Sequence, residues 1–380
     1  MASFSLDAEH DAFRASVRAL AETHIAPHAA LADETEKFPE RSWRAWCAAG
    51  FAGLAFPEAL GGQGAGALVH AIAVEEVARV CASSSLFVFI PKMSCGLLLS
   101  HGSQELIERV VPRVVTGECL ASYCLSEANA GSDVSAMRTT AVRDGDTYVL
   151  NGAKSWITGA GESHFYTVFC KTDPEAGHRG ISAFVIEADA AGFSVGKMER
   201  KMGMRGSPTG EIIFNDCVVP AANLIGELGR GFYYAMGALD GSRPLVGAQA
   251  LGIAQGALDT AVAYVQEREQ FGSKIAEFQG VRFMLADMAA QIEAARLLVY
   301  RACSLLDEGG TGTAMASASA KLFASDTAMN VTTDVVQLLG GVGYTREMPA
   351  ERMMRDAKVT QIYEGTNQIQ RIVIAKELLG

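Results

Sequence analysis

One carboxylate, Glu364, stands between an aromatic residue and a glycine near the C-terminus, in Gln361-Ile-Tyr-Glu-Gly-Thr-Asn-Gln-Ile-Gln-Arg371. A carboxylate can take up a proton, and the glycine after it lets the backbone approach a ligand closely. Thr366 and Asn367 are residue types that cap helices, and apolar residues resume helical spacing after them. We therefore expect Glu364 on a loop at a helix start, either with a chemical role or as a solvated loop glutamate.

Two further segments carry side chains suited to a bound cofactor. The loop Tyr123-Cys-Leu-Ser-Glu-Ala-Asn-Ala-Gly-Ser-Asp133 is rich in small and hydroxyl residues, whose N–H and O–H groups suit phosphate oxygens and ring carbonyls. An ordinary turn with a capping serine is the alternative. Trp156 precedes Thr158 by two residues on a predicted strand, so both side chains point to one face, where a planar cofactor could lie. The alternative for Trp156 is a buried strand residue.

Composition limits the classes of protein to consider. A chain of 380 residues exceeds one ordinary core and suits two or three structural units. Hydrophobic residues make up 49% and charged residues 20%, as in globular proteins. With 32 Lys and Arg against 43 Asp and Glu, the net charge of −11 argues against nucleic acid or an anionic membrane as the main partner.

The cysteines and the apolar segments bear on location. Eight scattered cysteines form no CxxC pair and have no histidine at metal-ligand spacing, which predicts free thiols in a reducing compartment and no metal site. The first ten residues carry charges, and no run approaches the ~20 apolar residues of a membrane span. We expect no secretory leader, no membrane span and a cytoplasmic location.

The pattern of elements divides the chain into three domains. Residues 1–120 show helical periodicity at 7–26, 41–50, 67–82 and 103–115, and the glycine-rich segment 57–66 is predicted as a connector. Residues 121–235 show short β-like runs, with a hairpin around Asp144-Gly145 and strands at 164–170, 181–187 and 211–219. Residues 236–380 predict long helices over 248–267, 281–307 and 313–340. The expected fold is α+β and mainly α: an N-terminal helical domain, a middle antiparallel β-sandwich or barrel-like domain, and a C-terminal four-helix bundle.

Six segments in this order resemble markers of the acyl-CoA dehydrogenases, and the likeness covers nearly the whole chain. They are Pro57-Glu-Ala-Leu-Gly-Gly62, Leu125-Ser-Glu-Ala-Asn-Ala-Gly-Ser-Asp133, Asn151-Gly-Ala-Lys-Ser-Trp-Ile-Thr158, Arg268-Glu-Gln-Phe-Gly272, Gln337-Leu-Leu-Gly-Gly-Val-Gly-Tyr344 and Gln361-Ile-Tyr-Glu-Gly-Thr-Asn-Gln-Ile369. The chain looks closest to the actinobacterial branch. The resemblance implies a flavoenzyme of this fold that oxidises an acyl thioester to its 2,3-enoyl thioester.

The resemblance also implies two groups of FAD-binding residues. The isoalloxazine and part of the pyrophosphate would contact Tyr123, Leu125, Ser126, Gly131, Ser132, Trp156, Ile157 and Thr158. The adenosine and pyrophosphate end of a neighbouring subunit's FAD would contact Arg268, Phe271, Gln279, Gln337, Leu338, Gly340 and Gly341, with Thr366 and Gln368 completing the cradle. An arginine fork suits a diphosphate, although Arg268 read alone is a charge on a solvated helix end. A site shared between subunits implies at least a dimer, and the family habit is a tetramer.

Glu364 matches the family's usual catalytic base, which removes the proton next to the thioester carbonyl. Some members carry the base at the position that here is Ser242, and serine cannot serve. The substrate would contact Ser132, Asp240, Arg243, Tyr363 and Gly365. For Asp240 and Arg243, ion pairing at a helix end is the alternative. The implied partners are an acyl-CoA or acyl-carrier-protein substrate and an electron-transfer flavoprotein as electron acceptor.

Two departures from the family pattern bear on the site. Ala128 stands where most members have a proline, which removes stiffness from the cofactor loop, although we expect FAD binding to be retained. Phe87, Phe89 and Pro91 lie on the helix that forms the floor of the acyl pocket in the family. There they predict a preference for short or branched acyl chains, and aromatic core packing is the alternative.

Two other functions stay open from the sequence. A flavin oxidase of the same fold would pass electrons to oxygen, and a non-enzymatic relative would act as a DNA-associated or assembly protein. The net charge of −11 and the lack of a basic patch count against the second.

Overall fold

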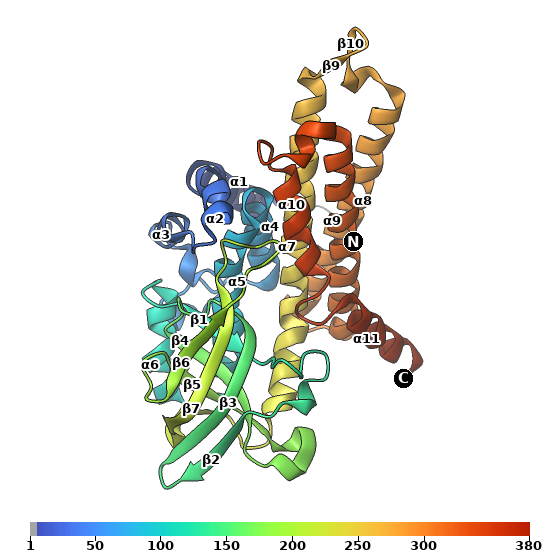
Figure 1. The fold of residues 1–380 in the computed structure, drawn as a ribbon. Coiled ribbons are helices and arrows are strands. Elements are labelled where there is room, and N and C mark those ends of the chain that lie inside the picture. Colours follow the sequence, from blue (N-terminus) through green and yellow to red (C-terminus); the bar gives the residue numbers. More distant parts are fainter. Residues whose placement is uncertain (1–5) are drawn as a thin grey trace.

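The computed structural model describes residues 6–380, with helices at both ends of the chain and a sheet between them (Figure 1). The sequence predicts no secretory leader at the N-terminus. Residues 1–5 of that segment lie outside the described residues. The N-terminal helices and the long C-terminal helices pack side by side, and the sheet lies below the N-terminal helices in Figure 1. The expected order of helices, strands and helices is confirmed.

The N-terminal part contains six α-helices, whereas the pattern predicted four helical segments. They are α1 (Ala8–Leu20), α2 (Ala26–Thr35), α3 (Glu40–Ala48), α4 (Ala67–Val80), α5 (Ala82–His101) and α6 (Gln104–Val115). A π-helical turn, Ala21–Ile25, joins α1 to α2, so the helix expected over 7–26 extends to Thr35. Helix α5 is apolar on all sides and shows no amphipathic period, because it is buried on nearly every face. The predicted connector contains only the 3₁₀ turn Glu58–Leu60.

Helix α5 is long and apolar enough to cross a membrane, with a mean hydropathy of 1.5 over its 18-residue window. From the sequence we expected no segment long and apolar enough to span a membrane. However, 78% of that window is buried inside the protein, which is typical of a core helix. It is the one such helix among residues 6–380.

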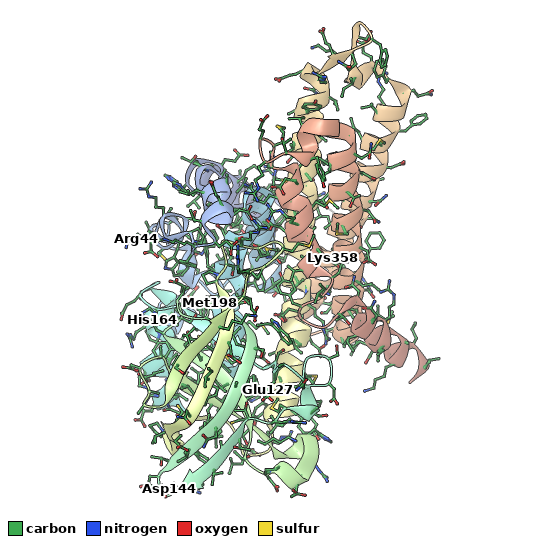
Figure 2. The ribbon with its side chains drawn as sticks, viewed as in Figure 1. Arg44, Glu127, Asp144, His164, Met198 and Lys358 are labelled. Carbon is green, nitrogen blue, oxygen red and sulfur yellow. The ribbon has the colours of Figure 1, made fainter. Side chains whose placement is uncertain are left out.

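The middle part forms one eight-stranded sheet. Its strands are β1 (Ala121–Cys124), β2 (Thr140–Asp144), β3 (Thr147–Thr158), β4 (Phe165–Lys171), β5 (Ile181–Glu187), β6 (Phe193–Met198), β7 (Thr209–Pro220) and β8 (Leu224–Ile225). The order is β6-β7-β3-β2-β4-β5-β8, with β1 paired to β4. The β2–β3 hairpin turns beyond Asp144, as predicted, and Asp144 lies at its tip in Figure 2. Most pairs are antiparallel, but β1 and β2 both pair with β4 in parallel, so the sheet is mixed rather than purely antiparallel.

The C-terminal part is a bundle of long helices. It contains α7 (Gly231–Glu267), α8 (Gln279–Asp307), α9 (Thr313–Leu339), α10 (Ala350–Thr360) and α11 (Asn367–Leu379). A small ribbon, β9 (Glu269–Gln270) with β10 (Ser273–Lys274), forms the tip between α7 and α8 (Figure 1). Helix α7 begins 17 residues before the helix predicted from Ala248. Its first turn lies before the predicted domain boundary at residue 235, and the boundaries themselves stay predictions.

The remaining short turns are 3₁₀ helices at Phe51–Gly53, Val134–Ala136, Pro174–Gly180, Ala221–Asn223, Ile275–Glu277 and Gly340–Tyr344. All eight cysteines are free thiols, as expected, and seven of them are buried.

One hydrophobic core joins the two helical parts, because α4 and α5 pack against α7. Phe87 and Phe89 belong to this core. The ring of Phe87 packs edge-on against Trp43 at a centroid distance of 5.3 Å. The sheet and α6 enclose two further cores. Helix α7 therefore has one face in the main core and carries its N-terminal turns past the sheet.

A buried ion pair fixes the loop between β1 and β2 onto β3. The Lys154 ammonium, which is fully buried, donates to Glu127 Oε1 at 2.8 Å and to the carbonyl of Leu125 at 3.1 Å. Glu127, labelled in Figure 2, also accepts the backbone N–H groups of Arg138 and Thr139. Both ends of the loop are thus held by one carboxylate, which offsets the stiffness lost where Ala128 replaces a proline.

Glu127→Gln tests this anchor. The change leaves the Lys154 ammonium buried without its counter-charge, and breaking a buried pair in this way costs about 3–5 kcal/mol. We expect the free energy of unfolding in urea to fall by that amount. The double variant Glu127→Gln, Lys154→Met removes both charges and keeps an amide oxygen that can accept the N–H groups of Arg138 and Thr139, so it should lose much less. Equal losses in the two variants would contradict the proposed role of the pair.

Candidate active site

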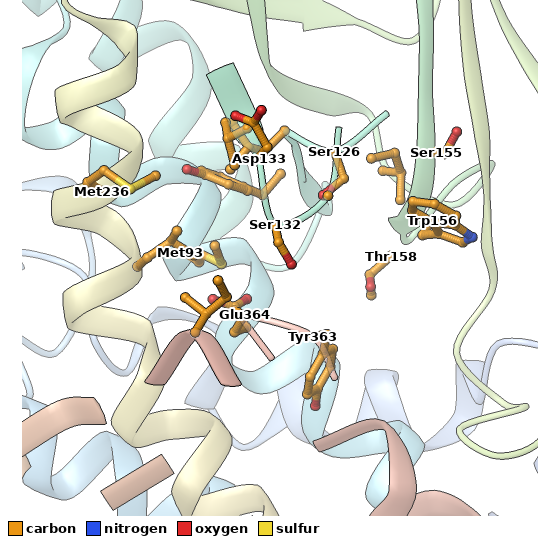
Figure 3. A pocket seen from close by; sticks show the side chains of 18 of the residues that line it. Met93, Ser126, Ser132, Asp133, Ser155, Trp156, Thr158, Met236, Tyr363 and Glu364 are labelled. Atoms are coloured by element: carbon orange, nitrogen blue, oxygen red, sulfur yellow. The ribbon is translucent and has the colours of Figure 1, made fainter. Parts of the chain in front are cut away.

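The loop after β1, the end of β3, helices α5 and α7, and the loop before α11 surround one pocket of about 300 Å³ (Figure 3). Twelve of the residues predicted from the sequence line it: Tyr123, Leu125, Ser126, Gly131, Ser132, Trp156, Ile157, Thr158, Arg243, Tyr363, Glu364 and Gly365. These residues come from four separate parts of the chain. The fold therefore brings the candidate cofactor loop and the candidate base into one cavity.

The pattern did not identify ten other lining residues: Ile90, Met93, Asp133, Val134, Ser135, Ser155, Phe232, Met236, Leu239 and Ile369. Phe232, Met236, Leu239 and Arg243 follow helical spacing along α7 and present one face to the pocket. Helical spacing in the sequence could have placed these four residues on one face of a helix. It does not show whether that face lines a pocket or packs into a core.

Glu364 lies on the loop between α10 and α11, as predicted, in a strained backbone conformation. Its φ is +56° and that of Gly365 is +86°, so two successive residues are left-handed. This region costs a non-glycine residue roughly 1–2 kcal/mol and is enriched at functional sites. Thr366 is the N-cap of α11 and accepts the N–H of Ile369, which fixes where the loop ends.

The carboxylate of Glu364 is held from α7. Ser242 Oγ donates to Glu364 Oε2 at 2.6 Å. Burial raises the pKa of Glu364, while the Ser242 hydrogen bond and the charges of Arg243 and Lys321 oppose that rise. Ser242 stands where some family members carry the base. In this chain its hydroxyl positions the carboxylate of Glu364 instead. A raised pKa brings a carboxylate closer to the range in which a general base works best.

Lys321, on α9, fixes the loop that carries Glu364. Its buried ammonium donates to the carbonyl of Gly365 at 2.9 Å and to Asn367 Oδ1 at 2.8 Å. Burial lowers the pKa of Lys321 to about 7, and the nearby Glu364 works against that shift. Gln370 also donates to the carbonyls of Glu364 and Gly365. The loop carbonyls are therefore satisfied, whereas the Glu364 N–H has no hydrogen-bond partner among the described residues.

The sheet side of the pocket offers a flat surface and free polar atoms. Trp156 sits at a β-bulge with φ +59°, and 52% of its surface is exposed although the residue belongs to a central strand. Trp156, Ile157 and Thr158 all line the pocket, but Trp156 is exposed and Ile157 is buried. Figure 3 labels Trp156 and Thr158 in the pocket. The buried hydroxyl of Tyr123 has no partner in the described chain. An exposed indole and an unpaired hydroxyl in the same pocket fit a planar ligand with polar edges.

Arg243 and Asp240 form an ion pair, the alternative to the expected substrate contact, although they lie within α7 rather than at its end. Arg243 Nη1 donates to Asp240 Oδ1, and burial raises the pKa of Asp240 while Arg243 opposes this. Arg243 lines the pocket and Asp240 does not. Arg243 Nε is buried with no partner in the described chain, which leaves a donor for a ligand.

The second predicted cofactor group lies elsewhere. The ribbon β9–β10, which Arg268 precedes and Phe271 joins, is at the far tip of the bundle from the sheet (Figure 1). Phe271 is 96% exposed, and Arg268, Gln337, Gly340 and Gly341 are exposed too. None of these residues lines the pocket, nor do Gln279, Leu338, Thr366 and Gln368. The assignment of these residues to a neighbouring subunit's FAD stays a prediction.

The expectation that Phe87 and Phe89 shape the acyl pocket is wrong. Both side chains pack into the main core, and α5 presents Ile90 and Met93 to the pocket instead. Pro91 is buried within α5, which continues through it to His101. A preference for short or branched chains therefore has no basis in these three residues.

Family models match the chain in three consecutive parts. They are the N-terminal domain of acyl-CoA dehydrogenase at residues 7–118, its middle domain at 122–217 and its C-terminal domain at 229–379. The probable acyl-CoA dehydrogenase FadE25 of Mycobacterium tuberculosis is 54% identical over 376 residues, which are 99% of this chain and 97% of the relative. This confirms the actinobacterial resemblance.

Solved structures share the whole fold. The butyryl-CoA dehydrogenase of Megasphaera elsdenii has a TM-score of 0.96 at 41% identity, covering 100% of both chains. A chain from a structural study of the electron-transferring flavoprotein of Acidaminococcus fermentans has a TM-score of 0.97 at 45% identity, again over 100% of both chains. The pocket, the fold and these relatives agree: the chain belongs to the acyl-CoA dehydrogenase family, the FAD-dependent oxidoreductases that dehydrogenate acyl-CoA thioesters.

Proposed function

We propose that Glu364 is the base that removes the α-proton of the acyl thioester in this enzyme. The observation that carries the proposal is the half-buried carboxylate held at 2.6 Å from Ser242 Oγ, inside the pocket that Trp156 and Thr158 line on the other side. A half-buried carboxylate with a raised pKa is suited to accept a proton once substrate excludes water. The dehydrogenation removes one proton from the α-carbon and one hydride from the β-carbon.

The same loop offers a donor for the thioester carbonyl. The Glu364 N–H points to no acceptor in the described chain, and a negative charge develops on the thioester oxygen as the proton leaves. A backbone donor that is already fixed stabilises this charge without reorganisation. Lys321 and Gln370, which hold the neighbouring carbonyls, keep this N–H free to act.

The sheet side of the pocket would hold FAD, which supplies the hydride acceptor when bound. Trp156, Thr158 and Ser126 would contact the flavin, since they line the pocket opposite Glu364 (Figure 3). The exposed residues around Arg268 would contact the FAD of a second subunit. The proposal therefore includes a homo-oligomer, with a tetramer as the family's usual assembly.

The proposal extends to the partners. The proposed substrate is an acyl-CoA, and an acyl-carrier-protein thioester is the alternative. An electron-transfer flavoprotein is the proposed electron acceptor, supported by the likeness to a chain studied with the electron-transferring flavoprotein of Acidaminococcus fermentans. A cytoplasmic location agrees with eight free thiols, which persist in reducing compartments.

Non-covalent FAD is the first expectation to check. Acid precipitation of the purified protein should release FAD into the supernatant. Trp156→Ala should weaken FAD binding about tenfold, since an aromatic contact contributes roughly 0.5–1.5 kcal/mol. Val142→Ala is the matched control, because Val142 is also an exposed apolar residue of the sheet but lies outside the pocket. A protein that neither releases FAD nor takes it up would refute the cofactor site.

Glu364→Gln removes the base and keeps its shape. We expect flavin reduction by an acyl-CoA, followed by loss of absorbance near 450 nm, to slow by about 10²–10⁴-fold, the usual share of a general base. FAD content and thioester binding should change little. Glu58→Gln, at an exposed site outside the pocket, should keep the wild-type rate. If Glu364→Gln reduces its flavin at the wild-type rate, another group takes the proton.

Ser242→Ala tests the hydrogen bond to the base. The Ser242 hydroxyl stabilises the ionised carboxylate, so its loss raises the pKa of Glu364 further. Because the base must be ionised, the acid limb of the pH profile of flavin reduction should move up by ~1–2 pH units. Ser242→Thr keeps the hydroxyl and should restore the profile. An unshifted acid limb in Ser242→Ala would mean that the hydrogen bond does not tune the base.

The contact also predicts a rescue. A glutamate introduced by Ser242→Glu in the Glu364→Gln background would place a carboxylate beside the same substrate atoms, because the two side chains already touch. Part of the lost rate of flavin reduction should return.

A further inference from the structure

One acidic residue of α9, Asp326, joins both ends of the loop that carries Glu364. Helix α9 packs against α10, which precedes the loop, and against α11, which follows it (Figure 1). Asp326 Oδ1 accepts Gln361 Nε2 at 2.6 Å and Asn367 Nδ2 at 2.7 Å. Gln361 is the C-cap of α10, and Asn367 is the first residue of α11. One carboxylate oxygen therefore closes the loop, with Glu364 midway between the two ends.

Two neighbours of Asp326 on α9 hold the same end of the loop. The buried side-chain amide of Asn367 donates to Ser325 Oγ at 2.9 Å, and its oxygen accepts the Lys321 ammonium at 2.8 Å. The backbone N–H of Asn367 also donates to the Gln361 carbonyl at 3.0 Å, which closes the loop through the main chain. We call Lys321, Ser325 and Asp326 the α9 clamp, because all three contact the loop or its ends from one helix.

The clamp holds the loop in a conformation that costs free energy. Glu364 and Gly365 are both left-handed, with φ of +56° and +86°. A non-glycine residue persists in this region where the surrounding structure over-determines the backbone. Asp326 fixes the two ends, and Lys321 donates to the Gly365 carbonyl between them at 2.9 Å. The strained position of Glu364 is thus imposed from α9.

Asp326 is remote from the reacting atoms. Among the described residues, no hydrogen bond or ion pair joins Asp326 to Glu364, and Arg371 Nη2 lies 3.4 Å from Asp326 Oδ2. Asp326, Gln361 and Asn367 do not line the active-site pocket. An effect of Asp326 on the chemistry must therefore pass through the position of the loop.

We propose that Asp326 is a positioning residue for the transfer of the α-proton: it fixes both ends of the loop so that the Glu364 carboxylate stays within reach of the substrate. This inference rests on the proposed function, because it requires Glu364 to be the base. Asp326 takes up no proton and contacts no substrate. A displacement of a catalytic group by about 1 Å can slow a reaction on the order of a hundredfold. Opening the loop should therefore slow the proton step and leave thioester binding unchanged.

The experiment measures flavin reduction in the FAD-loaded enzyme by butyryl-, octanoyl- and palmitoyl-CoA. With the fastest of these, Asp326→Ala should lower the limiting rate by about tenfold or more and change the half-saturating concentration by less than about threefold. Asp326→Asn keeps an oxygen that can accept the Gln361 and Asn367 amides, so it should restore most of the rate. Asp334→Ala, at an exposed aspartate of the same helix, is the control and should keep the wild-type rate.

A double-mutant cycle separates positioning from a general effect on the fold. Glu364→Gln removes the carboxylate that Asp326 would position. In that background, Asp326→Ala should slow flavin reduction by no more than about twofold, because the two changes act on one interaction. A purely structural role would lower the rate by the same factor in both backgrounds. If Asp326→Ala does not fold, Gln361→Ala removes one arm of the same contact and should cost about threefold in the cycle.

The outcomes separate the two levels of inference. If no acyl-CoA reduces the wild-type flavin, or Glu364→Gln keeps the wild-type rate, the proposed function fails and the role of Asp326 fails with it. If Glu364→Gln is slow but Asp326→Ala reduces its flavin at the wild-type rate, the base is Glu364 and Asp326 does not position it. Equal rate losses in the two backgrounds of the cycle would also overturn the positioning role.

Discussion

Keeping one carboxylate ionisable inside a largely apolar pocket is the constraint on which the rest of the site depends. Burial opposes the charge of Glu364, and three groups on two helices counter it: the Ser242 hydroxyl and Arg243 on α7, and Lys321 on α9. None of them forms a direct ion pair with the carboxylate. A full ion pair would hold the pKa low and weaken the group as a base. The partial compensation leaves Glu364 fixed in place while it can still take up a proton.

Helix α7, which carries two of these groups, is continuous for 37 residues despite its glycines and proline. It supplies Ser242 and Arg243 to the site and packs its other turns against α4 and α9. At Gly252 and Gly256 the α4 backbone approaches so closely that a side chain would not fit. Tertiary packing thus overrides the low helix propensity of this segment. The helix needs small residues for close packing in its middle.

Patterns in the sequence predicted the parts of the site that depend on local chemistry. The loop position of Glu364, the cap at Thr366 and the hairpin after Asp144 follow from turn and capping residues, which act over a few positions. Helical periodicity did not predict the start of α7, which is rich in glycine, or helix α5, which is apolar on every face. Pairing of β1 and β2 with β4 links distant strands, which local patterns do not specify.

Contacts between distant segments decided what the local pattern left open. Trp156 was compatible with a buried strand residue or a cofactor surface, and the β-bulge, which shifts the register against β7, places the indole in the pocket. Phe87 was compatible with a pocket floor or a core, and its packing against Trp43 places it in the core. Ala128 suggested a slack loop, yet its neighbour Glu127 anchors that loop to Lys154, which lies 27 residues further along the chain. In each case a residue type allowed two outcomes, and a partner from another part of the chain selected one, because packing and ion pairing act through space and leave no local sequence signal.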